Sequence, residues 1–272
     1  MLLHDLTSLL RDGKIGKWFL YPSWPCIIVL SDKNQEKIVE EGGLKALLML
    51  LGISKSATIH QVASGAIANL AMNETNQVLI VSKGGAQLLA DIASRTDDPP
   101  TLRAVAEAIA NLCGNRLSTN WIQAKPVQSP EKLHVMLKED GVIKVLMKMV
   151  LSGYADVIAE VARGLANFAK YEFRARSHGQ RKGPSLLLED GALTWLISNS
   201  TTTSASTRHH IELALCHLAE NDENTQDFIS SGALKELARI SCGSSKEDVR
   251  DSAKKTLKLN PRFRFWMQTN AD

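Results

Sequence analysis

Aromatic residues make up only 5% of the 272 residues, and signals for β-strands are scarce. Strands are expected where β-branched residues alternate with polar ones between hairpin turns, so this scarcity disfavours a sheet protein. The four cysteines lie far apart and include no C-x-x-C pair, which disfavours both a disulfide framework and a zinc site. They are Cys26, Cys113, Cys216 and Cys242. We therefore expect a reducing compartment.

Long apolar runs and strong charge are also lacking. The run WFLYPSWPCIIVL, residues 18–30, has about 13 residues and two prolines, whereas a membrane helix needs about 20 apolar residues. The first residues lack the early positive charge and the cleavage site of a signal peptide. A net charge of +3 without a recognised nucleic-acid motif gives no reason to expect DNA or RNA. We expect a cytoplasmic protein that binds neither membrane nor nucleic acid.

Catalytic motifs are missing as well. The chain has no G-x-S-x-G nucleophile elbow and no G-x-x-x-x-G-K-[ST] phosphate loop. His209 and His210 are adjacent, so they lie on different faces of a helix, and no partner ligand follows four residues later. The sequence predicts no catalytic residue, no metal site and no cofactor.

A short phrase repeats along the chain instead. Ala-Asn-Leu occurs at residues 68–70 and 110–112, Ala-Asn-Phe at 166–168 and Cys-His-Leu at 216–218. A glycine and a leucine-rich run precede each phrase, and the first two phrases are 42 residues apart. A helical repeat of about 40–47 residues is typical of armadillo and HEAT proteins. We predict an all-α, right-handed superhelical solenoid of about five armadillo repeats.

Each repeat reads as a short helix, a glycine turn, a buried helix and a long third helix. The third helix of the second repeat begins with Asp98 before Pro99, which is a good cap followed by a tolerated proline. The five repeats cover residues 31–73, 74–115, 131–170, 184–220 and 221–260. The predicted organisation is an atypical N-terminal segment that caps the array at 1–31, an armadillo domain at 32–260 and a tail at 261–272. The domain includes an insertion at 116–130 and a basic loop at 171–184.

The repeats resemble the tail repeats of plant armadillo-repeat kinesins over most of residues 32–258. The phrases that carry the resemblance include NQEKIVEEGGLKALLMLLG, ASGAIANLAMNETNQ, AEAIANLCGN and TSASTRHHIELALCHLAENDEN. The resemblance implies a non-catalytic, cytoskeleton-associated scaffold of a microtubule motor, with microtubules or tubulin and NIMA-related kinases as partners. Residues 1–31 and 116–130 depart from the family pattern. They are either alternative or mispredicted coding segments, or a genuine cap and surface loop.

Third helices of armadillo arrays face the ligand, and residues four apart on a helix form columns on that face. The asparagine of each phrase sets the register of these columns, which are carried into the fifth repeat by an offset of 41 residues. The resulting groove candidates are Gln61, Asn69, Arg103, Glu107, Asn111, Arg163, Asn167, His209, His217, Arg250, Lys254 and Lys258.

Two readings of these candidates stay open. The asparagine amides either bind the main chain of an extended peptide or tie adjacent helices together. The cations of the last repeats either favour an acidic or phosphorylated segment or form a solvated face.

The basic loop contains Arg174, Arg176, Arg181 and Lys182 around Ser177. We expect it to contact acidic tubulin tails, to be a phosphorylation site, or to be a solvated loop. Two other functions are weaker. An importin-type peptide receptor is disfavoured because Gly65, Glu107 and Arg163 replace the tryptophans that such receptors carry, and the substrate-binding part of a ubiquitin ligase is disfavoured because no U-box is present.

Overall fold

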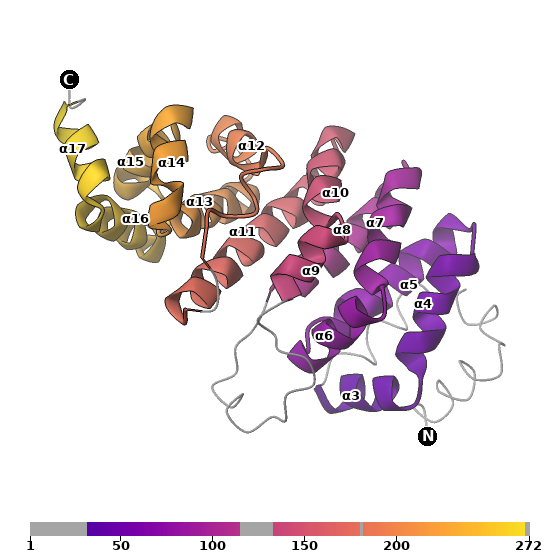
Figure 1. The fold of residues 1–272 in the computed structure, drawn as a ribbon. Coiled ribbons are helices and arrows are strands. Elements are labelled where there is room, and N and C mark those ends of the chain that lie inside the picture. The colour runs from indigo at the N-terminus through magenta and orange to yellow at the C-terminus, as the bar shows by residue number, and fades with distance from the viewer. Residues whose placement is uncertain (1–31, 115–132, 180–181, 270–272) are drawn as a thin grey trace. The chain divides into compact units, whose positions relative to one another are not determined.

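The computed structural model describes residues 32–114, 133–179 and 182–269 (Figure 1). All regular elements of these ranges are helices, and the predicted all-α armadillo fold is confirmed. The N-terminal segment 1–31 and the insertion 116–130 lie outside the described residues. The chain divides into two compact units, residues 1–157 and 158–272.

The first unit repeats a three-helix order. α5 and α8, which are equivalent third helices, lie side by side and make the most extensive helix contact of the unit (Figure 1). α4 packs on α5, and α7 packs on α8. The helices are α3 (Asp32–Glu40), α4 (Gly43–Ile53), α5 (Ala57–Leu70), α6 (Glu74–Ser82), α7 (Gly85–Arg95), α8 (Pro99–Cys113), α9 (Leu133–Glu139) and α10 (Val142–Met149), followed by the 3₁₀ turn η4 (Val150–Ser152).

Helix boundaries follow from a few residues. The side chain of Asp98 accepts a hydrogen bond from the main-chain N–H of Thr101 at 2.9 Å, so the predicted cap of α8 is confirmed. Ser56 caps α5 in the same way. The marker glycine before each second helix has a positive φ, which residues with a side chain rarely adopt. These glycines are Gly42, Gly84, Gly141, Gly191 and Gly232, with φ between 75° and 87°.

Asparagine side chains stabilise the turn that joins one repeat to the next. Asn73 caps α6, and Nδ2 of Asn76 donates to the carbonyl of Leu70 at 3.3 Å. In the second unit, Nδ2 of Asn224 donates to the carbonyl of Leu218 at 2.8 Å. Since the last carbonyls of a helix have no partner within the helix, these amides satisfy groups that the corner would otherwise leave unpaired.

The second unit contains most of α11 and the last two repeats. Its helices are α11 (Ala155–Ser177), whose first turn belongs to the first unit, α12 (Ala192–Ser198), α13 (Ala205–Ala219), α14 (Thr225–Ser231), α15 (Ala233–Gly243), α16 (Glu247–Leu259) and α17 (Pro261–Thr269), with the 3₁₀ turn η5 (Asp222–Asn224) before α14. α15 packs on α16, and α13 contacts both.

The expected basic loop at 171–184 is wrong in its first half, because α11 continues as a helix to Ser177. The fourth repeat also lacks a first helix, since turns occupy residues 186–191. Buried Glu172 of α11 holds this segment: it accepts hydrogen bonds from the hydroxyl of Ser185 and from the N–H of Leu186. A side chain of the lengthened α11 thus replaces the missing helix as the anchor.

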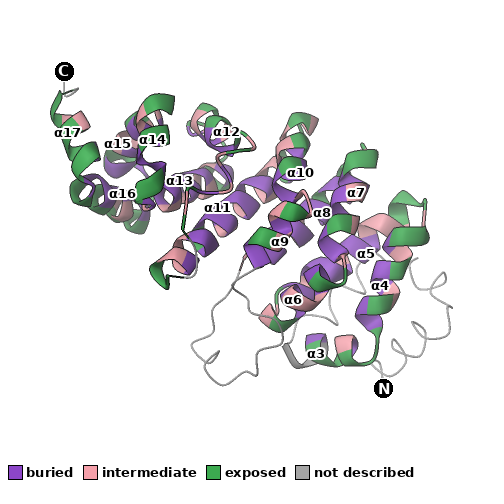
Figure 2. Cartoon of the chain, viewed as in Figure 1, coloured by how far each residue is buried: buried purple, intermediate pink, exposed green. Residues whose placement is uncertain are grey.

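The expected tail at 261–272 is also corrected. α17 packs on α16 and α14, and Phe263 is fully buried. Its ring lies 6.1 Å from that of Phe228. Figure 2 shows buried residues on the packed faces of the helices in each unit and exposed residues on the outer turns. Because fully burying a large apolar side chain contributes about 1.5–3 kcal/mol, α17 stabilises the last repeat.

Candidate peptide-binding site

In the first unit, the groove candidates form a stripe along α5 and α8. The stripe positions lie 5, 9 and 13 residues after the capping residues Ser56 and Asp98. Apart from half-buried His60 before Gln61, the residues on both sides of each stripe position along the helix are buried, whereas the stripe itself is half-buried or exposed. The stripe consists of Gln61, Gly65, Asn69, Arg103, Glu107 and Asn111. These third helices therefore leave one polar face open to a ligand.

Asn111 has a structural bond within the protein. Its Nδ2 donates to the main-chain carbonyl of Ala68, in the preceding third helix, at 2.8 Å. This side chain therefore ties α8 to α5, which is one of the two roles expected for the asparagines. Its amide remains half-buried and borders the open face.

Gln77 is a residue that the sequence analysis missed. It is 1% exposed, and its Nε2 lies within hydrogen-bond distance of the carbonyls of Ala71, Asn111 and Gly114, at 2.9, 3.0 and 2.6 Å. The side chain thus links the end of α5 to the end of α8, the two helices that carry the stripe. The signal was present in the phrase NETNQ, which follows the first Ala-Asn-Leu phrase.

In the second unit, several candidate cations already have partners. Arg163 pairs with Glu160 at 2.6 Å, and both are half-buried. Nδ1 of His217 lies 3.2 Å from a carboxylate oxygen of Glu220, and its ring stacks on Phe173 with centroids 6.2 Å apart. A cation that is already paired attracts an acidic ligand less strongly. The pairing weakens the expectation that this column takes an acidic segment.

The offset of 41 residues that placed the last column is wrong by one. α13 follows its cap Ser204 and α16 follows its cap Lys246, so the two helices are 42 residues apart. Fully buried Ile211 and Ala253 agree with this register. The residues equivalent to His209, Leu213 and His217 are therefore Asp251, Lys255 and Leu259.

The three candidates that the offset of 41 had placed in this column, Arg250, Lys254 and Lys258, lie elsewhere. Nη1 of Arg250 donates to the carbonyl of Ser244 at 2.6 Å, in the turn that precedes its own helix. Lys254 and Lys258 are exposed and line a different hollow, at the end of the last repeat. The structure does not bring these three residues into the column formed by His209 and His217.

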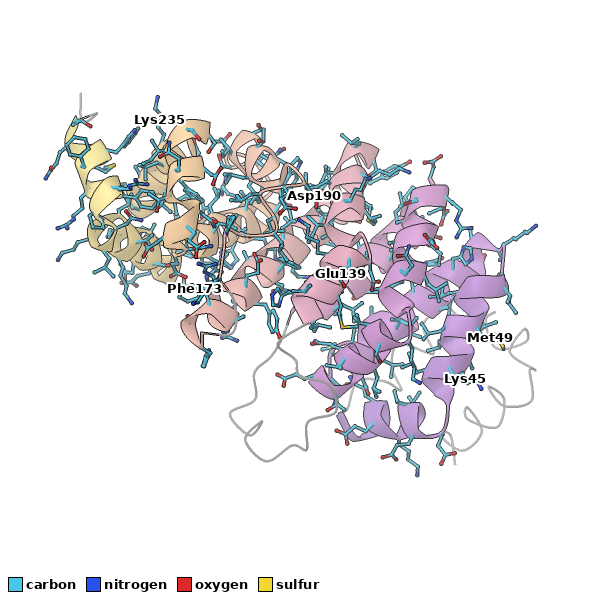
Figure 3. All side chains as sticks on the ribbon, viewed as in Figure 1. Lys45, Met49, Glu139, Phe173, Asp190 and Lys235 are labelled. Atoms are coloured by element: carbon cyan, nitrogen blue, oxygen red, sulfur yellow. The ribbon has the colours of Figure 1, made fainter. Side chains whose placement is uncertain are left out.

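The corrected column borders a hollow of about 300 Å³ in the second unit. Phe173, which Figure 3 labels, and Leu259 provide apolar walls, while Glu220 and Lys255 provide opposite charges. Leu259 is 65% exposed, which is unusual for so large an apolar side chain in a packed repeat. Ala219, Asp222, Thr256, Asn260 and Pro261 complete the lining. The hollow suits a side chain with an apolar stem and a polar end.

The basic segment after α11 is held in place by Arg176. Nη2 of Arg176 lies 2.8 Å from a carboxylate oxygen of Glu223, and Nη1 donates to the carbonyl of Gly183. The same carboxylate oxygen accepts from the N–H of Gly183 at 3.0 Å. Lys182 is exposed, and Arg181 lies outside the described residues. Arg176 therefore has a structural role as a latch.

Arg174 and Ser177 belong to the last turn of α11 rather than to a loop. The hydroxyl of Ser177 donates to the carbonyl of Phe173 at 2.9 Å and is exposed. Arg174 is half-buried.

His210 and Cys216 are among the groups of this unit whose pKa values are shifted. Burial, together with the nearby positive charges of His209 and Arg163, lowers the pKa of His210, against a smaller opposite effect of Glu160. Burial also raises the pKa of Cys216 to about 12. Both shifts favour the neutral form, so neither group adds charge to the open face at neutral pH.

The described ranges offer neither a metal site nor a membrane-spanning helix. They contain no group of three or more His, Cys, Asp or Glu side chains placed to hold a metal ion. Within the same ranges, no helix has the length and apolar character needed to cross a membrane.

Comparison with known proteins agrees with this architecture. Residues 31–72 match the family described as Armadillo/beta-catenin-like repeat. A designed armadillo repeat protein superposes with a TM-score of 0.70 at 21% identity, covering 94% of this chain and 93% of that one. Another, in complex with the peptide (KR)4, gives a TM-score of 0.72 at 21% identity and covers 95% of this chain and 99% of that one. At this identity the likeness shows the fold alone.

Curated relatives are much closer in sequence. Kinesin-like protein KIN-UA of Oryza sativa subsp. japonica is 58% identical over 96% of this chain, which spans 26% of that protein. Kinesin-like protein KIN-UC of Arabidopsis thaliana is 59% identical over 46% of this chain and 12% of its own length. The chain thus spans about a quarter or less of these relatives. The resemblance to plant armadillo-repeat kinesins that the sequence predicted is confirmed for nearly the whole chain.

Proposed function

We propose that this chain is a non-catalytic protein-binding scaffold, a tail-like adaptor of a microtubule motor, and that it binds an extended segment of a partner along its third helices. The observation that carries this proposal is the open polar stripe of α5 and α8, which lies among mostly buried residues. The kinesin-like relatives support the cytoskeletal setting.

The stripe matches the needs of an extended peptide. Such a peptide exposes main-chain N–H and C=O groups that require partners. Gln61 and Asn69 each offer an amide that both donates and accepts. Arg103 is exposed and Glu107 half-buried, so their charges select among the side chains of the peptide. Binding in this way requires no rearrangement of the helices.

The proposed partners are microtubules or tubulin and kinases of the NIMA-related type, and the proposed location is the cytoplasmic cytoskeleton. A segment with both charged and apolar side chains suits the second unit, where Phe173 and Leu259 stand beside Glu220 and Lys255.

The test is sedimentation of the full chain with taxol-stabilised microtubules. The stripe variant Gln61→Ala/Asn69→Ala/Arg103→Ala spares Asn111, whose bond to α5 is structural. The matched control changes three exposed residues of α4, α7 and α10, as Lys45→Ala/Gln87→Ala/Lys144→Ala.

We expect the stripe variant to lose most of its binding and the control to keep it, with equal helical content by circular dichroism. Equal binding by both variants would place recognition outside the stripe. If the unaltered chain does not sediment, a purified NIMA-related kinase replaces the microtubules in the same comparison.

A further inference from the structure

The positive charge of this protein is concentrated at its last two helices. Residues 254–269 contain five Lys or Arg and no Asp or Glu, although the whole chain has a net charge of only +3. These residues form the end of α16 and all of α17. A local excess of this size creates a positive potential at this end of the last repeat.

Three of the cations surround one hollow. Lys254 and Lys258 lie four residues apart on one face of α16, and Arg264 comes from α17. Leu257 and Met267 provide its apolar surface, and Ser241 and Gln268 complete the lining. This shallow feature, of about 370 Å³, is called the terminal hollow below.

The cations of the terminal hollow are poorly neutralised. Lys254 lies 3.9 Å from a carboxylate oxygen of Asp251, with both side chains more than half exposed, so this pair contributes little. Within the described part of the chain, neither Lys258 nor Arg264 has an ion-pair partner. By contrast, Arg163 and Arg176 each pair with a glutamate at less than 3 Å.

The position of Lys254 is one that earlier repeats bury. It lies eight residues after the cap of its helix, where α5 has Ser64, 0% exposed, and α13 has Glu212, 2% exposed. In α13 the next repeat covers this position, since the hydroxyl of Ser244 donates to Glu212 at 2.6 Å. The side chain of Lys254 itself is 60% exposed, so a polar partner can reach it.

We propose that the terminal hollow binds an acidic segment of a partner protein. An apolar side chain of the segment contacts Leu257 and Met267, and flanking carboxylates pair with Lys254, Lys258 and Arg264. A site that combines a small apolar surface with three poorly neutralised cations distinguishes such a segment from a purely apolar or a basic one. This site goes beyond the proposed function, because it lies outside the stripe of α5 and α8.

The test measures fluorescence anisotropy of the full chain with a labelled peptide of glutamates interrupted by phenylalanines. A second peptide carries glutamine in place of every glutamate. The variant Lys254→Glu/Lys258→Glu/Arg264→Glu removes the site. The control Lys45→Glu/Lys83→Glu/Lys144→Glu changes the net charge equally, at exposed lysines of the first unit. Figure 3 shows one of these, Lys45, on the outer side of α4.

We expect the terminal variant to bind the acidic peptide at least about tenfold more weakly, since three exposed pairs are lost and replaced by repulsion. The control should stay within about threefold, and the glutamine peptide should bind weakly to every variant. Met267→Gln, which makes the apolar surface polar without changing its charge, should also weaken binding.

Several outcomes would overturn the proposal. One is an equal loss of peptide affinity in the terminal and control variants, which would mean that net charge alone determines binding. Another is unchanged binding by the terminal variant. A third is that the unaltered chain does not bind the peptide but sediments with phosphatidylserine vesicles, and that the terminal variant no longer does so. A fourth is concentration-dependent dimerisation that the terminal variant abolishes, which would make this face an interface between copies. The microtubule assay with the stripe variant is independent of all four.

Discussion

Gly85 begins α7 at a point where the protein leaves no room for a side chain. A Cβ built at this residue lies 2.6 Å from Cγ2 of Ile80, 2.8 Å from the carbonyl oxygen of Ile80 and 3.0 Å from Cδ2 of Leu48. By contrast, a Cβ at Gly65, in the middle of α5, meets nothing within 4 Å. Alanine should therefore have opposite effects at these two glycines.

The magnitudes follow from two opposing contributions. Overpacking a core costs about 1–3 kcal/mol, whereas alanine in place of glycine within a helix contributes up to about 1 kcal/mol. Gly85→Ala should lower the free energy of unfolding by about 1–2 kcal/mol, because the carbonyl of Ile80 cannot move like the end of a flexible side chain. Gly65→Ala should raise it by about 0.5–1 kcal/mol.

The first repeat has the same pair of residues, Gly43 and Ile38, but the later repeats do not. Later repeats carry a side chain at the position of Gly85, namely Val142, Ala192 and Ala233. The residue equivalent to Ile80 in those repeats has no β-branch; these residues are Leu137, Leu187 and Phe228, all buried. Ile80→Leu should therefore recover part of the stability of Gly85→Ala, although the contact with the carbonyl oxygen remains.

Urea unfolding followed by circular dichroism measures the unaltered chain, Gly65→Ala, Gly85→Ala, Ile80→Leu and the double variant Gly85→Ala/Ile80→Leu. Hydrogen exchange of α6 and α7 shows whether the loss is local. Since repeat arrays need not unfold in one step, the exchange data decide where the change lies. A loss of stability in Gly85→Ala and a gain in Gly65→Ala, each of the stated size, support the packing argument. A stabilised Gly85→Ala, or no coupling with Ile80→Leu, would refute it.

Other predictions concern single side chains. Gln77→Ala removes the donor shared by three carbonyls and should lower the free energy of unfolding by about 1–3 kcal/mol in the same titration. Arg176→Ala removes the latch to Glu223, so amides of residues 182–190 should exchange faster while those of α5 do not change. With its pKa raised to about 12, Cys216 should resist iodoacetamide at mildly alkaline pH until the protein unfolds, whereas exposed Cys242 reacts. Equal labelling of both cysteines would contradict the burial of Cys216.

Local patterns predicted what depends on neighbours along the chain. Asp98 caps α8 because the group it binds lies three residues away, and the marker glycines turn because their own backbone requires it. The register that the repeated phrases set likewise holds for the caps of α5, α8 and α13, since each phrase lies inside the helix that it marks. It failed for α16, where no phrase occurs and one extra residue precedes the helix.

The sequence by itself therefore determined the all-α class, the repeat and the stripe, because helix periodicity and turn residues act over a few positions. Only the tertiary structure decided which polar groups are free. Asn111, Arg163 and His217 look alike as exposed polar candidates, yet each has a partner in the fold. The tertiary structure also showed that the expected tail is α17: Asn260 caps this helix by accepting from the N–H of Phe263, and the ring of Phe263 is buried beside Phe228. A partner in another helix, or in the preceding turn, leaves no mark on the local pattern.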